Sequence, residues 1–189
     1  MDYPYFKDVL LNAGIGQADI DSKILPLFQT LTVTKETHLL QIGDRFDSVF
    51  IIRTGAVRLY YLSPSGNESN KQFFFENDVI FPVAPVAYLQ PSRFAIACCE
   101  DVSLLKASYK QFKSTIEKLG DWDKWHIEYL KWLANQKVQR EYDFLTKSAS
   151  ERFKSILVDN NTNLRRVADF HLASYLGMTP VSLSRIKHQ

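Results

Sequence analysis

Three hydroxyl and three basic side chains are concentrated near the C-terminus, within the ten residues 179–188. Thr179 can cap a helix, and Pro180 suits the first helical position because that position needs no amide hydrogen. Hydroxyls and backbone amides at a helix start can contact phosphates, and Arg185 can donate two hydrogen bonds to a guanine. The side chains that this chemistry places against DNA are Thr179, Pro180, Val181, Ser182, Ser184, Arg185, Lys187 and His188.

The segment FHLASYLGMTPVSLSRIK (170–187) supplies two helices that would hold these side chains in place. Leu172, Ala173 and Leu176 share one helical face, and Gly177 can adopt the left-handed conformation of a tight turn. Leu183 and Ile186 would face the first helix. The pattern indicates a helix-turn-helix, whose second helix enters the major groove. A helical hairpin without nucleic acid is the alternative.

The charge of the chain is unevenly distributed. Residues 1–145 contain 16 Lys and Arg against 18 Asp and Glu, whereas residues 146–189 contain 7 against 3. A basic end on a nearly neutral body favours a polyanionic partner for that end. A solvated basic surface would give the same count, so the charge supports the DNA interpretation without proving it.

The sequence gives little support for catalysis, metal binding or membrane targeting. Only His38 lies in the region of expected strands, so the clustered histidines of a metal-binding barrel enzyme are missing, and we predict no enzyme, metal or certain cofactor. The adjacent Cys98 and Cys99 do not suit a disulfide, which leaves inert core thiols or an oxidant sensor. The N-terminus lacks the pattern of a secretion signal, and no apolar run reaches the roughly 20 residues of a membrane span. We therefore expect a cytoplasmic protein with no membrane partner.

Residues 39–105 have the pattern of an antiparallel β-sandwich or barrel, with short apolar runs separated by turn residues. The strongest runs are VFIIR (49–53), AVRLYYL (56–62), KQFFF (71–75), RFAIACC (93–99) and VSLLKA (102–107). AVRLYYL alternates, which predicts a strand with one solvated face.

From residue 109 the pattern becomes helical. Residues 110–118 form a short amphipathic stretch, and Asp121 can cap a helix that runs to about residue 145 without Gly or Pro. We expect a further helix at 149–158 and a loop at 159–163. The long helix has an aromatic stripe that we expect to face a second subunit, although packing on its own domain is the alternative. The stripe consists of Trp122, Trp125, Tyr129 and Trp132.

The C-terminal segment resembles the helix-turn-helix of the Crp/Fnr family of transcription regulators, especially the branch found in Bacteroidetes-type bacteria. Residues 42–81, with Gly43-Asp44 and Asn77-Asp78, are similar to that family's cyclic-nucleotide-binding-type barrel, and residues 91–105 resemble the stretch after its ligand cassette. The resemblance implies an α+β chain: an antiparallel jelly-roll sensor (1–118), a long dimerisation helix (119–146) and a helix-turn-helix domain (147–189). It also implies a homodimer on a palindromic operator, with RNA polymerase as a partner.

The sequence departs from the cyclic-AMP-binding members at the ligand cassette. Phe81-Pro82 stands near their Gly-Glu pair, and Ser92-Arg93 stands where they carry Arg-Ser. A shift of one residue in a strand turns a side chain to the opposite face. We therefore expect the barrel not to bind cyclic AMP in the usual way and to take an unidentified small molecule, if any. The candidate pocket consists of Phe73, Phe75, Phe81, Arg93 and Phe94.

Two further expectations concern the C-terminal domain. Few residues follow Lys187, so we expect the β wing that relatives often carry to be short or missing. Pro180 and Val181 stand where well-known relatives place polar, base-reading side chains. The alternative function is therefore an effector-binding sensor or scaffold that acts through protein contacts without DNA.

Overall fold

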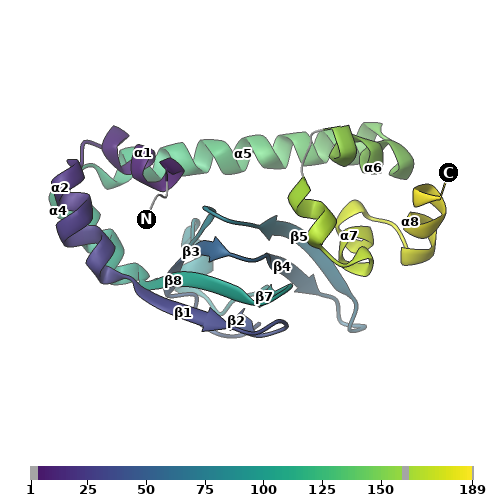
Figure 1. Ribbon diagram of the computed structural model, residues 1–189, viewed down its shortest axis with the longest axis horizontal. Helices are drawn as coiled ribbons and strands as arrows, with labels where there is room; N and C mark the ends of the chain where they lie inside the picture. Colours follow the sequence, from purple (N-terminus) through teal and green to yellow (C-terminus); the bar gives the residue numbers. More distant parts are fainter. Residues whose placement is uncertain (1–3, 159–161, 189) are drawn as a thin grey trace.

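The computed structural model describes residues 4–158 and 162–188. Two four-stranded antiparallel sheets form its centre, with strand orders β1-β8-β3-β6 and β2-β7-β4-β5. Figure 1 shows them beneath a long helix that extends over the whole body. The strands are β1 (Gln29–Val33), β2 (His38–Leu40), β3 (Ser48–Thr54), β4 (Val57–Leu62), β5 (Glu68–Phe74), β6 (Val79–Ile80), β7 (Ala95–Cys98) and β8 (Val102–Ser108).

The two sheets enclose an apolar core. Phe50 and Leu104 come from one sheet and Leu59, Phe74 and Ile96 from the other, and all five are buried in one cluster. Each strand pair in this sandwich is antiparallel, with Ile51 opposite Leu105 and Leu59 opposite Ile96. The predicted antiparallel two-sheet arrangement is therefore confirmed.

Helices surround this sandwich on its N-terminal and C-terminal sides. Residues 20–27 form a π-helical turn followed by a 3₁₀ turn, and residues 162–166 form another 3₁₀ segment. Within the described residues, none of the helices combines the length and hydrophobicity that crossing a bilayer requires. The helices are α1 (Pro4–Asn12), α2 (Gln17–Asp19), α3 (Pro85–Leu89), α4 (Tyr109–Leu119), α5 (Trp122–Thr146), α6 (Ala149–Val158), α7 (Asp169–Leu176) and α8 (Pro180–Lys187).

Helix α5 begins where the sequence predicted. The Asp121 carboxylate accepts a hydrogen bond of 3.0 Å from the backbone amide of Lys124, which caps the helix. Its 25 residues span about 37 Å at 1.5 Å per residue. α6 also begins with a capping box, since Ser148 and Glu151 exchange hydrogen bonds with each other's backbone amides. The predicted loop 159–163 lies mostly outside the described residues.

The aromatic stripe of α5 does not face a second subunit. Trp122, Trp125 and Tyr129 are buried in the chain's own core, against Phe81 and Phe112. Trp132 is half-buried and packs on the same cluster. The reason is that α1 and α4 extend the barrel's apolar surface far enough to cover this stripe, which the sequence pattern did not reveal.

A second apolar stripe of α5 lies on the opposite face and is exposed. Its members recur every three or four residues, so they share one side of the helix. Val138 is 66% and Leu145 79% exposed, values that large apolar side chains seldom reach without a partner. The stripe consists of Ile127, Leu130, Ala134, Val138, Tyr142 and Leu145.

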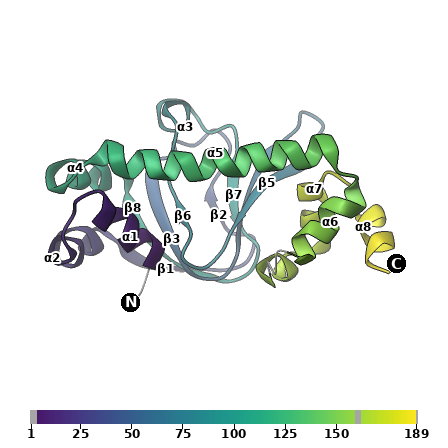
Figure 2. The same cartoon turned by 90° about the horizontal axis from the view of Figure 1, so that it is seen from above.

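Helices α6 and α7 and the 3₁₀ segment pack against the sheet that contains β5 (Figures 1 and 2). Phe73 of β5 and Phe75, which directly follows this strand, are buried against Leu164 and Leu172. This contact corrects the prediction that β4 has one solvated face. Arg58 and Tyr60 were expected in solvent, but both are buried. The Arg58 guanidinium binds Asn70, which is bonded to α7, and lies 4.0 Å from the centre of the Tyr60 ring.

Candidate nucleic-acid interface and ligand cavities

The turn between α7 and α8 has the predicted geometry. Gly177 is left-handed, with φ 67° and ψ 40°, and the amide of Met178 donates to the Ala173 carbonyl at 3.0 Å. Thr179 caps α8 by accepting a hydrogen bond of 3.1 Å from the Ser182 amide. Ala173 and Leu183 are fully buried, so the two helices cross closely. The sequence signals at Gly177, Thr179 and Pro180 therefore gave the correct local structure.

The exposed side of α8 contains several side chains without internal partners. Figures 1 and 2 show this helix at the outer end of the molecule, with α7 on its inner side. Ser184, Arg185 and His188 are exposed and make no hydrogen bond or ion pair with the residues that the structure describes. Val181 is 61% exposed. Arg185 can therefore approach a groove without breaking an internal contact.

The other predicted contact residues are already engaged within the chain. The hydroxyls of Thr179 and Ser182 lie 2.9 Å apart in a shared hydrogen bond. The Lys187 ammonium forms an ion pair with the Asp169 carboxylate at the start of α7. Pro180 is exposed but has no donor to offer. The eight predicted residues do share one helix, yet only half of them are free to meet a partner.

Much of the basic charge after residue 146 is also used internally. Arg152 donates to the carbonyls of Lys147 and Leu176, at 2.7 and 3.0 Å. Arg166 pairs with the carboxylates of Glu76 and Glu100. Among the described residues of this region, Arg152, Lys154, Arg165 and Arg185 have no ion pair, and Arg152 is held by its two carbonyl hydrogen bonds. The free positive charge is therefore smaller than the sequence count indicated.

A polar network joins α7 to strand β5, which sequence reasoning missed. The backbone amide of Asn70 donates to the Ser174 hydroxyl at 3.0 Å, and that hydroxyl donates to the Glu68 carbonyl at 2.9 Å. The Asn70 side chain donates to the His171 carbonyl at 3.2 Å. Burial, with Arg58 nearby, lowers the pKa of His171 to about 4, so its ring is neutral at physiological pH. No local pattern marks these residues, because their partners are about a hundred positions away.

The barrel contains a mostly apolar cavity of about 190 Å³ beneath α3 and α5. Phe81 and Phe94 line it together with Phe46, Phe74 and Tyr129. Among the described residues that line it, Lys71 is the only one with a charge. Two members of the predicted effector pocket, Phe81 and Phe94, therefore share this cavity, and its role as an effector site stays a prediction.

The other three members of the predicted pocket lie elsewhere. Phe73 and Phe75 point out of the barrel toward the C-terminal helices, because they alternate with Phe74 along β5. Arg93 is exposed and its guanidinium lies 3.5 Å from the Gln90 side-chain oxygen. Ser92 is buried instead, and its hydroxyl donates to the Phe94 carbonyl at 2.7 Å. The predicted effector pocket is therefore wrong as a single site.

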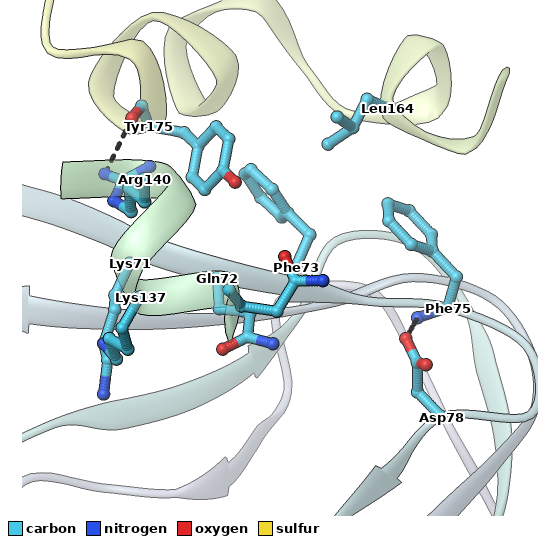
Figure 3. A pocket seen from close by; sticks show the side chains of 10 residues that line it. Lys71, Gln72, Phe73, Phe75, Asp78, Lys137, Arg140, Leu164 and Tyr175 are labelled. Carbon is cyan, nitrogen blue, oxygen red and sulfur yellow. Dashed lines mark hydrogen bonds between the residues drawn. The ribbon is translucent and has the colours of Figure 1, made fainter. Parts of the chain in front are cut away.

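A second cavity, of about 170 Å³, lies where β5, α5 and α7 meet (Figure 3). The ring of Phe73 lies 5.3 Å from that of Tyr175, and Phe75 and Leu164 complete an apolar wall. Its polar residues are Lys71, Gln72, Asp78, Gln136, Lys137 and Arg140. This cavity involves the barrel, the long helix and the C-terminal helices at once.

The described part of the chain contains no group of three His, Cys, Asp or Glu side chains able to hold a metal ion. Burial raises the pKa of Cys98 to about 11 and that of Cys99 to about 12. Both thiols are therefore protonated at neutral pH, and a protonated thiol is a poor nucleophile.

Comparison with known families gives one match within the chain. Residues 30–118 match the family described as Cyclic nucleotide-binding domain, which covers the two sheets and α4. A search of curated proteins found no match to this sequence.

The whole chain has clear counterparts among solved structures. FixK2 from Bradyrhizobium japonicum superposes with a TM-score of 0.72 at 18% identity, over 86% of this chain and 83% of its own. A protein from Eubacterium rectale assigned to the Crp/Fnr family of transcriptional regulators gives 0.74 at 16% identity, over 100% and 87%. The c-di-GMP-responsive regulator CLP from Xanthomonas campestris gives 0.69 at 13% identity, over 91% and 90%.

These similarities agree with the order of parts seen in the structure, a two-sheet sandwich, a long helix and a group of short helices. At such low identity the solved structures establish the fold, and the family match identifies the sandwich. Residues 30–118 thus match the model of the cyclic nucleotide-binding domain family, and the chain as a whole has the fold of these solved structures.

Proposed function

We propose that this chain is a sequence-specific DNA-binding transcription regulator of the Crp/Fnr type, and not an enzyme. The observation that carries the proposal is the exposed outer face of α8, where the side chains of Arg185, Ser184 and His188 make no hydrogen bond or ion pair with any described residue and Val181 is exposed. α7 and α8, joined at the left-handed Gly177, act as a helix-turn-helix. α8 enters the major groove, and Arg185 reads a guanine. Its assignment to the Bacteroidetes-type branch stays a prediction.

Two chains pair through the exposed stripe of α5. Burying Val138, Leu145 and their neighbours against the same stripe of a second copy removes a large apolar surface from water. The symmetric pair presents two α8 helices to half-sites about 34 Å apart on a palindromic operator. The units are 1–118, 119–146 and 147–189, and RNA polymerase is the expected partner on the promoter.

The barrel cavity suits an apolar effector better than a cyclic nucleotide. A cyclic phosphate needs a cation and hydrogen-bond donors in the barrel. Arg93 is exposed instead of lining the cavity, which leaves Lys71 as the one charged residue among its described lining. The phenylalanine lining favours a ligand with little charge. The sensor therefore does not bind cyclic AMP in the usual way.

Selection of bound sequences from random duplex DNA tests this function. We expect a conserved palindrome to emerge, with retarded complexes that weaken steeply as salt rises. Arg185→Ala lowers affinity for the selected duplex by about tenfold or more, the value of one bidentate base contact. Arg45→Ala removes an exposed arginine from the barrel and serves as the matched control.

Two outcomes would contradict the proposal. If Arg185→Ala and the parent chain bind the selected duplex with equal affinity, Arg185 does not contact the bases in the groove. If no duplex is retarded even at low salt, the chain acts instead as an effector-binding sensor or scaffold through protein contacts.

A further inference from the structure

The cavity between β5, α5 and α7 has an excess of positive charge (Figure 3). Three cations line it, Lys71 from β5 and Lys137 and Arg140 from α5, against a single carboxylate, that of Asp78. Asp78 is turned toward the backbone and accepts a hydrogen bond of 2.8 Å from the Phe75 amide. Burial raises the pKa of Asp78 to about 6, so its negative charge is weakly held.

Lys71 and Lys137 are the unusual pair in this cavity. Their side chains run together in Figure 3, although both are cationic and come from different elements. Neither has an ion pair with any residue in the described part of the chain. Burial and the adjacent Lys71 lower the pKa of Lys137 to about 8. Like charges held side by side are unfavourable unless an anion lies between them.

Arg140 is fixed in place beside these lysines. Its guanidinium lies between the rings of Phe144 and Tyr175, at 4.6 and 4.3 Å from their centres, and donates to the Tyr175 carbonyl at 2.8 Å. It therefore contributes a stationary positive charge that needs no rearrangement to act. The two lysines, in contrast, have no carboxylate partner among the described residues. The Lys71 ammonium lies 5.6 Å from the centre of the Tyr61 ring and next to Lys137.

The remaining wall is apolar and aromatic. Phe73, Phe75, Leu164 and Tyr175 form it. A ligand that fits both the lysines and the aromatic wall of this cavity has a compact dianionic group and a small apolar or aromatic body. The dianionic group contacts the lysines, and the body packs on the rings.

We propose that this cavity binds a small phosphate monoester through Lys71 and Lys137, with its organic group against Phe73 and Tyr175. This site is separate from the apolar cavity inside the barrel. Lys137, Arg140 and the C-terminal residues Leu164 and Tyr175 line this site and not the barrel cavity. The ligand touches β5, α5 and α7 together, so it holds the C-terminal helices in their docked position. The inference extends the proposed function by giving the chemical class of an effector.

Calorimetric titration of the full chain, without DNA, tests the site. The probes are phenyl phosphate, inorganic phosphate and benzoate at pH 7.5 and low salt. We expect one phenyl phosphate per chain, bound more tightly than inorganic phosphate because of the aromatic wall. Lys71→Gln and Lys137→Gln each weaken it by about tenfold or more, since each removes a charge-assisted hydrogen bond. Lys124→Gln, an exposed lysine of α5 away from the cavity, leaves the affinity unchanged.

Three results would overturn the inference. Absence of phenyl phosphate binding at millimolar concentration removes the site, and unchanged affinity in both lysine variants places the anion elsewhere. Benzoate binding as tightly as phenyl phosphate contradicts the preference for a dianion. Arg185→Ala separates the two proposals, because it impairs DNA binding and leaves phenyl phosphate binding intact.

Discussion

Arg166 and Glu76 join the C-terminal helices to the barrel through two parallel hydrogen bonds of 2.9 Å each. Glu76 also accepts a hydrogen bond of 2.8 Å from the Gly55 amide, so its carboxylate is held by the turn between β3 and β4. The guanidinium reaches Glu100 as well. A bidentate arginine of this kind fixes orientation in addition to adding attraction.

Removing this contact should loosen the docked helices without unfolding the barrel. Both side chains are about one third exposed, so we expect Arg166→Gln to cost at most about 1 kcal/mol of docking free energy. Hydrogen exchange of the α7 amides should accelerate, while the β3 and β8 amides keep their protection. Lys113→Gln, which breaks a surface pair with Glu117, is the control and should leave α7 unchanged.

Low pH should weaken the contact between Arg166 and Glu76, because the Glu76 carboxylate becomes protonated. Hydrogen bonds from Arg166 lower the pKa of Glu76 to about 2, below the usual value of 4.5. A carboxyl group whose pKa is lower in the folded state stabilises the fold at pH values above its pKa in the unfolded chain. This stabilisation is lost as the pH falls toward 2. The stability difference between the parent and Glu76→Gln should therefore be constant from pH 5 to 7 and shrink below pH 4.5 in urea unfolding. A difference that does not depend on pH would contradict the pairing.

The turn at Gly177 should tolerate no side chain. Its φ of 67° is unfavourable for alanine by about 1–2 kcal/mol, and an added Cβ would lie 2.6 Å from the Phe144 ring. Gly66 has a φ of 83° but open space around it. Gly66→Ala thus reports backbone strain alone, and Gly177→Ala should lower the free energy of unfolding by more, as measured by urea denaturation. Equal losses would show that Phe144 moves aside freely.

Dimerisation should depend on the exposed stripe of α5. Val138→Glu introduces a charge at its centre, where the partner's stripe would remove it from water. We expect the variant to sediment as a monomer at micromolar concentration while keeping its helical content. Lys110→Glu, on the exposed side of α4, should sediment as the parent does. A dimeric Val138→Glu would place the interface elsewhere.

Anion binding in the cavity should fall at alkaline pH. The pKa of Lys137 is about 8, set by burial and by Lys71 of β5, with Tyr61 of β4 and Arg140 of α5 also nearby. A bound dianion favours the protonated ammonium, so the added affinity is present below pH 8 and lost above it. The phosphate stays doubly charged there, because its second pKa is about 6. Phenyl phosphate should bind more weakly at pH 9.5 than at 7.5, and Lys137→Gln should flatten this decline.

The local features of the C-terminal half could be predicted from sequence. Asp121, Gly177 and Thr179 each act through neighbouring backbone groups, so their signals lie within a few residues and gave the ends of α5, α7 and α8. The long strands were predicted for the same reason, since alternating branched and aromatic residues are a local pattern.

Features that depend on distant partners could not be predicted. β1 is almost wholly exposed, and it forms because its backbone pairs with β8, about seventy residues away. The Trp122 stripe looked available because nothing in its spacing shows that α1 and α4 cover it. Phe73 and Phe75 were predicted to share a pocket with Phe81 and Phe94, but they face α7 and the cavity beside it instead.

The burial of Phe73 and Phe75 beneath the C-terminal helices limits how this molecule can move. Lifting those helices would expose two aromatic rings to water at a cost of several kcal/mol. Within one subunit, the barrel and the C-terminal helices should therefore move together. In the proposed dimer, the distance between the two α8 helices would then change by tilting whole subunits about the exposed stripe of α5, and not by hinging of the C-terminal helices away from the barrel.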